Sequence, residues 1–145
     1  MRIARIGSLG QEKPAVVQGD EYILVDSLIG DWSRATLEDG AMAKVAAADL
    51  SGLPRIAKGS TRIGSPINRP TKVICVGLNY LAHIKESNAE TPAEPVIFMK
   101  APDSVVGPND DIVIPPKSLA TDYEVELALV IGKRALYLNS PADSK

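Results

Sequence analysis

Two glutamates separated by a single residue give the sequence its clearest chemical feature. Glu124 and Glu126 lie in the segment of residues 122–131, in which Asp122 is the other acid and the remaining residues are apolar or aromatic. In an extended strand such residues share one face, about 6.6 Å apart, and their charges repel by about 2.5 kcal/mol at an effective dielectric near 20. Solvent can offset that repulsion, and so can a divalent cation. Oxygen ligands alone favour Mg²⁺, Mn²⁺ or Ca²⁺ over zinc, so the spacing leaves open a solvated strand face or a metal site.

The only histidine also has an acidic neighbour at a spacing that matters. His83 precedes Glu86 by three residues, and in a helix these positions lie on the same side. A carboxylate beside imidazole fixes its tautomer and favours its protonated form, so the pair could take a proton from water near neutral pH. A surface histidine with a helix-stabilising acid gives the same pattern. Its position just after a glycine turn at the end of a strand favours a catalytic dyad.

Two further residues are chemically notable but less specific. Lys100 ends the apolar run of residues 96–99 and could contact an anion or be a solvated strand end, and the sequence favours neither. Cys75, the single cysteine, has apolar neighbours and no second Cys or His nearby. It is therefore predicted to be a packed core thiol rather than a reactive group.

The elements that would position these residues fall into two regions, with a domain boundary predicted near residue 70. Residues 1–70 contain strand-like runs at 3–6, 15–18 and 21–25, a helical run at 36–53, and a linker rich in Gly, Ser and Pro from residue 58 onward. A tight turn at Gly19 and Asp20 should join two of the strands. We predict a small N-terminal domain made of a β meander and a helix.

The second region, residues 71–145, is predicted to be richer in strands. Strands are expected at residues 72–76, 96–99, 112–114, 123–131 and 136–138, with a helix at about 80–89 that Asn79 could cap. On the longest strand, the face opposite the glutamates should be core: Tyr123, Val125, Leu127, Leu129 and Ile131. The predicted fold class is α+β, mostly β.

Composition limits the classes of partner. The chain has 145 residues, of which 45% are hydrophobic and 23% charged, with a net charge of -2, as in soluble globular proteins. Its Lys and Arg residues are scattered, which argues against nucleic acid and anionic membranes as partners. There is neither an apolar run of the roughly 20 residues that span a bilayer nor a signal-peptide pattern, so a cytoplasmic protein is expected.

Four segments, taken in order, resemble the catalytic domain of the fumarylacetoacetate hydrolase family. They are VGLNYLAHIKE at residues 76–86, PAEPVIFMK at 92–100, VGP at 106–108 and DYEVELALVIGK at 122–133. No one motif is decisive, but four in register make coincidence improbable. The similarity covers about residues 64–135. The leading 70 residues resemble the small N-terminal domain that many bacterial members carry.

The resemblance implies a mixed β-roll, a homodimer, and Mg²⁺ or Mn²⁺ held by three carboxylates. It maps Glu124 and Glu126 onto two metal ligands, His83 and Glu86 onto the helix dyad, and Lys100 onto a family lysine. Members act on small 2-oxo or 2,4-dioxo acids, and a metal-held enolate is common to their reactions. In the hydrolytic reaction, water activated by His83 with Glu86 attacks the carbonyl farther from the metal.

The leading hypothesis is therefore a metal-dependent hydrolase that cleaves a carbon–carbon bond in a 2,4-dioxo acid of the acylpyruvate or fumarylacetoacetate type. A decarboxylase or a 2-hydroxyhepta-2,4-diene-1,7-dioate isomerase on the same scaffold is the alternative. The resemblance places the third metal carboxylate, with the rest of the roll, beyond Lys145, so the chain is expected to be the first part of this fold. A non-catalytic fragment or binding module is a second hypothesis, and a β-rich domain with solvated acids is a third.

Overall fold

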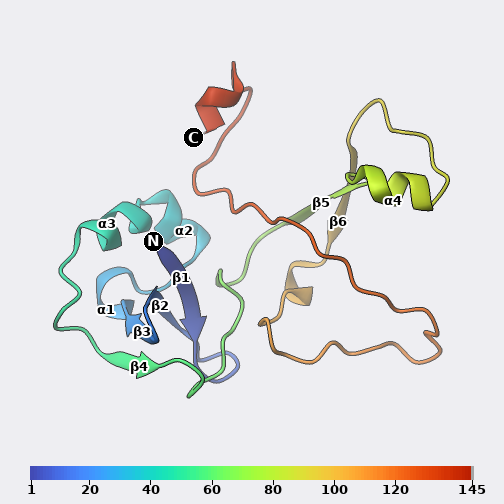
Figure 1. Cartoon of the computed structure of the whole chain (residues 1–145). Helices are drawn as coiled ribbons and strands as arrows, with labels where there is room; N and C mark the ends of the chain where they lie inside the picture. Colours follow the sequence, from blue (N-terminus) through green and yellow to red (C-terminus); the bar gives the residue numbers. More distant parts are fainter. Residues whose placement is uncertain (145) are drawn as a thin grey trace. The chain divides into compact units, whose positions relative to one another are not determined.

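The computed structural model describes residues 1–144, whose course is shown in Figure 1. The chain forms two compact units: one comprises Met1–Asn68 and Gly107–Lys145, and the other comprises Arg69–Val106. These units are defined by contacts within the structure and do not test the domain boundary predicted near residue 70. That boundary stays a prediction. Strands and helices both occur, so the predicted α+β class is confirmed. No helix in the described part of the chain is long and apolar enough to cross a bilayer.

The first unit is built on a four-stranded antiparallel sheet. Its strands, in the order β1-β2-β3-β4, are β1 (Arg2–Ile6), β2 (Lys13–Gln18), β3 (Glu21–Leu24) and β4 (Arg55–Ala57). The predicted tight turn between β2 and β3 is confirmed. Gly19 has φ of 54°, which a residue without Cβ adopts at little cost, and it lets Gln18 pair directly with Glu21.

Three short helices follow the hairpin: α1 (Asp26–Ile29), α2 (Arg34–Glu38) and α3 (Ala41–Ala47). The prediction of a single helix at residues 36–53 is wrong. Gly40 has φ of 83°, and this left-handed conformation separates α2 from α3. Helix α2 begins with a capping box, in which Ser33 and Thr36 bond to each other's backbone N–H groups.

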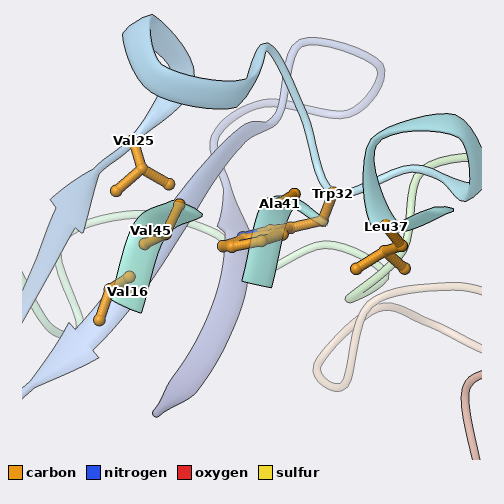
Figure 2. Close-up of a cluster of buried hydrophobic side chains, with 6 residues drawn as sticks. All are labelled: Val16, Val25, Trp32, Leu37, Ala41 and Val45. Carbon is orange, nitrogen blue, oxygen red and sulfur yellow. The ribbon is translucent and has the colours of Figure 1, made fainter. Parts of the chain in front are cut away.

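A buried tryptophan is the centre of the packing in this unit. Trp32 is 0% exposed, and its indole N–H donates to the backbone oxygen of Ala15 at 3.3 Å. Figure 2 shows it with the other buried members of its cluster: Val16, Val25, Leu37, Ala41 and Val45. These residues come from β2, α2, α3 and the connections around α1, so burial of their apolar surface holds the helices against the sheet.

The second unit contains an antiparallel pair of strands, β5 (Val73–Gly77) and β6 (Val96–Lys100), with helix α4 (Leu81–Glu86) between them in sequence. Both strands were predicted. The helix is shorter than predicted, and Tyr80 rather than Asn79 occupies its N-cap, with no side-chain hydrogen bond. Cys75 is only partly buried, so the expected packed core thiol is not observed. A 3₁₀ turn, η1 (Pro102–Ser104), follows β6.

The strands predicted at residues 112–114, 123–131 and 136–138 are absent from the structure. Within the described residues after β6, only η1 and a second 3₁₀ turn, η2 (Pro141–Ser144), interrupt irregular backbone. A strand needs a hydrogen-bonded neighbour, and in the described chain no other strand pairs with any of these three segments. The predicted core face at residues 123–131 is consequently exposed, by 74% to 83% for its five side chains: Tyr123, Val125, Leu127, Leu129 and Ile131.

Candidate functional site

Glu124 and Glu126 lie on irregular backbone in the first unit. Both are exposed, and within residues 1–144 neither carboxylate makes a hydrogen bond or an ion pair with another residue. The nearby Asp122 accepts a hydrogen bond from the backbone N–H of Tyr123 at 2.8 Å. Because the glutamates are separated by one residue and pair with no other described residue, their oxygens can serve as ligands for an external cation.

The donor set of the described residues is incomplete for a protein metal site. Two carboxylates suit the hard, oxygen-loving cations Mg²⁺ and Mn²⁺. However, among residues 1–144 there is no group of three or more His, Cys, Asp and Glu residues that could hold a metal ion. Glu124 and Glu126 therefore fit a divalent cation as two of its ligands, and further ligands are needed.

His83 and Glu86 are carried together by α4. The helix turns Ile84 into the protein, where it is 6% exposed, and leaves both polar side chains at the surface. The next residue, Ser87, donates from its backbone N–H at 3.0 Å and from its hydroxyl at 2.8 Å to the backbone oxygen of His83, which closes the helix. No hydrogen bond joins the imidazole to the Glu86 carboxylate in the described chain, so the dyad stays a prediction.

The turn that leads into α4 has an unusual backbone. Gly77 ends β5, and Leu78 follows with φ of 49°, in the left-handed region that residues with a branched side chain rarely adopt. Such conformations cost energy and cluster at functional sites. The glycine turn noted in the sequence is therefore a constrained junction, and it sets where the helix with His83 begins.

Lys100 is the last residue of β6 and is exposed. It pairs with Val73, whereas the turn toward α4 leaves from the opposite end of the strand pair, where Gly77 pairs with Val96. Four residue steps along a strand correspond to about 14 Å. The strand pair therefore does not place Lys100 beside the start of α4. His83, Glu86 and Lys100 belong to one compact unit, and Glu124 and Glu126 to the other.

Sequence reasoning missed one polar cluster. Arg62, in the Gly- and Ser-rich linker, is paired with Glu12 and with Asp110, which are 50 and 48 residues away in sequence. The only available signal was an arginine in a segment otherwise read as a connection, together with an acid after the Gly107–Pro108 turn. Pairings over such separations leave no local pattern in a sequence.

Comparison with known proteins defines the family. The model of the fumarylacetoacetate (FAA) hydrolase C-terminal domain matches residues 72–144. The chain is 40% identical over 139 residues to 2,4-didehydro-3-deoxy-L-rhamnonate hydrolase of Sphingomonas sp., a region that is 96% of this chain and 47% of the relative. It is 47% identical over 88 residues to human mitochondrial oxaloacetate tautomerase, covering 61% of this chain and 28% of that one.

Solved structures agree with the sequence matches. The crystal structure of maleylpyruvate hydrolase from Sphingobium sp., in complex with a manganese(II) ion and pyruvate, matches with a TM-score of 0.60 and 28% identity. The match covers 80% of this chain and 43% of that one. The chain thus belongs to the fumarylacetoacetate hydrolase family. It spans about half the length of the bacterial relatives it matches.

Proposed function

We propose that this chain is part of a metal-dependent hydrolase that cleaves a carbon–carbon bond in a small 2,4-dioxo acid. The family match over residues 72–144 carries the proposal, because it includes all five candidate residues: His83, Glu86, Lys100, Glu124 and Glu126. Two relatives support the reaction class, since both are named hydrolases. The second was crystallised with pyruvate, which is a 2-oxo acid, and with manganese.

Glu124 and Glu126 would supply two of the carboxylate ligands of a divalent cation, Mg²⁺ or Mn²⁺, with Ca²⁺ as a further candidate. When bound, such a cation stabilises negative charge on the substrate's 2-oxo oxygen. Both side chains are exposed and unpaired with other described residues, so no internal ion pair has to break before they bind it. We expect the third carboxylate, with the rest of the predicted β-roll, from the part of the family fold that this chain does not span, since the chain matches 47% of its rhamnonate hydrolase relative.

His83, Glu86 and Lys100 would serve the organic part of the reaction. His83 takes a proton from water, with Glu86 on the same side of α4 holding the imidazole and stabilising its charged form. The water oxygen adds to the 4-oxo carbon, the bond between carbons 3 and 4 breaks, and carbon 3 gains a proton. The products are a carboxylic acid and a 2-oxo acid. Lys100 would bind an anionic group of the substrate.

A tautomerase is the second candidate, because the chain is 47% identical over 88 residues to an oxaloacetate tautomerase. Keto–enol exchange also moves a proton beside a 2-oxo group, and it needs a base but no water as nucleophile. His83 could provide that base in either reaction. The two activities are separated by their products, since hydrolysis yields two acids and tautomerisation leaves the carbon skeleton intact.

Metal binding by the chain tests the shared part of both candidates. Mn²⁺ titrations followed by water-proton relaxation should show binding that weakens at least about tenfold in Glu124→Ala and in Glu126→Ala, because each change removes a charged ligand. Glu90→Ala is the matched control, since Glu90 is also exposed but lies outside the pair. Equal Mn²⁺ affinity in all variants would refute the metal assignment and leave the non-catalytic fragment or binding module as the better hypothesis.

Activity then separates the two reactions. With Mn²⁺ present, acylpyruvate cleavage should be followed by product analysis and oxaloacetate ketonisation by loss of enol absorbance. His83→Gln should abolish whichever activity is found. Cleavage without ketonisation supports the hydrolase, and the reverse supports the tautomerase. A homodimeric state and a cytoplasmic location are further proposals, tested by light scattering and by cell fractionation.

A further inference from the structure

Five charged side chains form a continuous series of alternating sign in the first unit. Asp31 accepts two hydrogen bonds from Arg5, at 2.8 and 2.9 Å, and Arg5 lies 3.7 Å from Glu12. Glu12 accepts from Arg62 at 2.6 Å, and Arg62 also donates to both oxygens of Asp110, at 2.7 and 2.5 Å. Arg62 is therefore shared by two carboxylates that are far apart in sequence.

The middle of this series is shielded from solvent. The Glu12 side chain is 8% exposed, against 25% for Arg62 and 21% for Asp110. Burial alone would raise the pKa of Glu12, but the hydrogen bond from Arg62 and the backbone N–H groups outweigh it and lower the pKa. The pKa of Asp110 is also lowered, first by the hydrogen bonds from Arg62 and then by the backbone N–H of Gly107. Both acids are charged at neutral pH, so Arg62 is matched on both sides.

Residues 62–64 are themselves fixed to the first strand. The backbone N–H of Gly7 donates to the oxygen of Arg62 at 2.9 Å, and the N–H of Gly64 donates to the oxygen of Arg5 at 2.8 Å. An isolated bridge also pairs Ile63 with Ile6. The guanidinium of Arg62 consequently projects from a backbone that is held as an extra edge beside β1.

The turn that carries Asp110 lies directly on this edge. The N–H of Gly107 donates to Asp110 at 2.6 Å, and a Cβ placed on Gly107 would lie 2.1 Å from the backbone oxygen of Ile63. It would also lie 3.1 Å from the Cα of Gly64. Only glycine fits such an approach, so the turn at residues 107–110 and the edge at residues 62–64 are in backbone contact.

The two contacting segments lie on opposite sides of the point where the family match begins. Arg62 precedes residue 72, where the family match begins, and Asp110 lies within it. The second arm of Arg62, to Glu12, is internal to the N-terminal part, whereas the arm to Asp110 is the one that reaches the matched domain.

We propose that Arg62 is a positioning residue that anchors the turn at residues 107–110 to the N-terminal sheet through Asp110. The anchored turn begins the segment that continues to Glu124 and Glu126, so it fixes the start of the backbone that carries these carboxylates. The consequence for the carboxylates rests on the proposed function, whereas the anchoring itself does not. The N-terminal domain acts, on this proposal, as a platform for the metal-binding segment rather than as an independent appendage.

The test uses variants that remove or weaken the hydrogen bonds between Arg62 and Asp110. Asp110→Ala removes the pairing with Arg62 together with the hydrogen bond from the Gly107 N–H, and it leaves the pair of Arg62 with Glu12 in place. Asp110→Asn keeps the shape of the side chain without the charge. Arg62→Lys keeps the charge but loses the two-pronged geometry. Arg55→Lys is the matched control, because Arg55 donates to Glu21 at 2.9 Å within the sheet and does not touch the turn.

Amide hydrogen exchange provides a readout that a purely stabilising role would not reproduce. In Asp110→Ala, exchange of the backbone amide at position 110, which donates to the Gly107 oxygen at 3.1 Å, should rise at least about tenfold, while exchange around the buried Trp32 stays at the wild-type rate. The exchange rates of Asp110→Asn and Arg62→Lys at the turn should lie between those of Asp110→Ala and the wild type. The rates of Arg55→Lys should equal the wild-type rates. A uniform rise throughout the chain, or an unchanged turn, overturns the anchoring.

Mn²⁺ affinity tests the consequence for the metal-binding segment. Where Glu124→Ala weakens Mn²⁺ binding, Asp110→Ala should weaken it severalfold although Asp110 is no ligand. Wild-type affinity in Asp110→Ala overturns the positioning role while leaving the proposed function intact. Wild-type affinity in Glu124→Ala removes the proposed metal site instead, and the anchoring is then decided by exchange alone.

Discussion

Arg62 and Asp110 face each other through two parallel hydrogen bonds, Nε to Oδ1 at 2.7 Å and Nη2 to Oδ2 at 2.5 Å, across 48 residues of sequence. This fork-to-fork geometry is stronger and more directional than a single charged contact. It joins the small N-terminal sheet to a turn of the matched hydrolase domain. On the positioning proposal, this contact links the N-terminal part to a proposed metal site whose candidate ligands, Glu124 and Glu126, lie elsewhere in the sequence.

The close contact between the turn and the N-terminal edge predicts that alanine destabilises the protein at Gly107 but not at Gly132. Gly107→Ala should lower the free energy of unfolding by about 1–3 kcal/mol and loosen the turn, because its Cβ would overlap the Ile63 oxygen. Gly132→Ala is the control, since within residues 1–144 no atom beyond its two chain neighbours lies within 4 Å of a Cβ there. Urea denaturation of both variants measures the difference. Equal stability of the two variants would show that the turn does not lie on the N-terminal edge.

Acidification should release the same turn. The pKa of Asp110 is held below its ordinary 3.8 and that of Glu12 below its ordinary 4.5. A depressed carboxylate pKa contributes stability that is present above the ordinary value and is lost as the pH falls through the folded-state value. The stability difference between wild type and Asp110→Asn should therefore be constant from pH 7 to about 5 and disappear toward pH 2. Urea titrations across this range measure it, and a difference that grows on acidification contradicts the assignment.

The short-range features of the fold could be predicted from the sequence. The β2–β3 hairpin depended on Gly19 and on alternating apolar residues, and β5, α4 and β6 had equally local signals. The break at Gly40 was missed because a run of alanines and good helix formers outweighed one glycine in the pattern. Here backbone conformation at a single residue decided the outcome.

The candidate site was predictable only as a set of residues. Spacing gave Glu124 with Glu126 and His83 with Glu86. In the structure all four side chains are exposed, the first pair on irregular backbone and the second on α4. Whether residues 123–131 pair as a strand depends on neighbours that no local pattern specifies. The pairings of Arg62 with Glu12 and Asp110 were not predicted for the same reason, since ion pairs between residues far apart in sequence depend on the tertiary structure.

Removal of the central tryptophan should destabilise the N-terminal sheet and helices strongly. Trp32→Ala should cost about 3–5 kcal/mol, because the side chain is fully buried and its neighbours cannot fill the cavity. Trp32→Phe should cost less, since it keeps most of the apolar contact but loses the hydrogen bond to Ala15. Urea denaturation followed by circular dichroism compares them. A larger loss in the phenylalanine variant would contradict this account of the core.

The apolar segment at residues 123–131 should make the chain bind hydrophobic dyes and self-associate. Tyr123, Val125, Leu127 and Leu129 are each at least 80% exposed, and they alternate with Glu124 and Glu126 along one short stretch. Exposed apolar side chains concentrated in one short segment favour association with other apolar surfaces.

Replacing Leu127 and Leu129 with serine should reduce dye fluorescence severalfold and shift the chain toward smaller species in light scattering. The control changes Leu9 to serine, because Leu9 is 79% exposed but isolated from this segment. The fall should be specific to the double variant, since burial of apolar area drives association. An equal fall in the Leu9 variant would assign the dye binding to scattered surface leucines, and unchanged fluorescence in both would show that residues 123–131 are covered in solution.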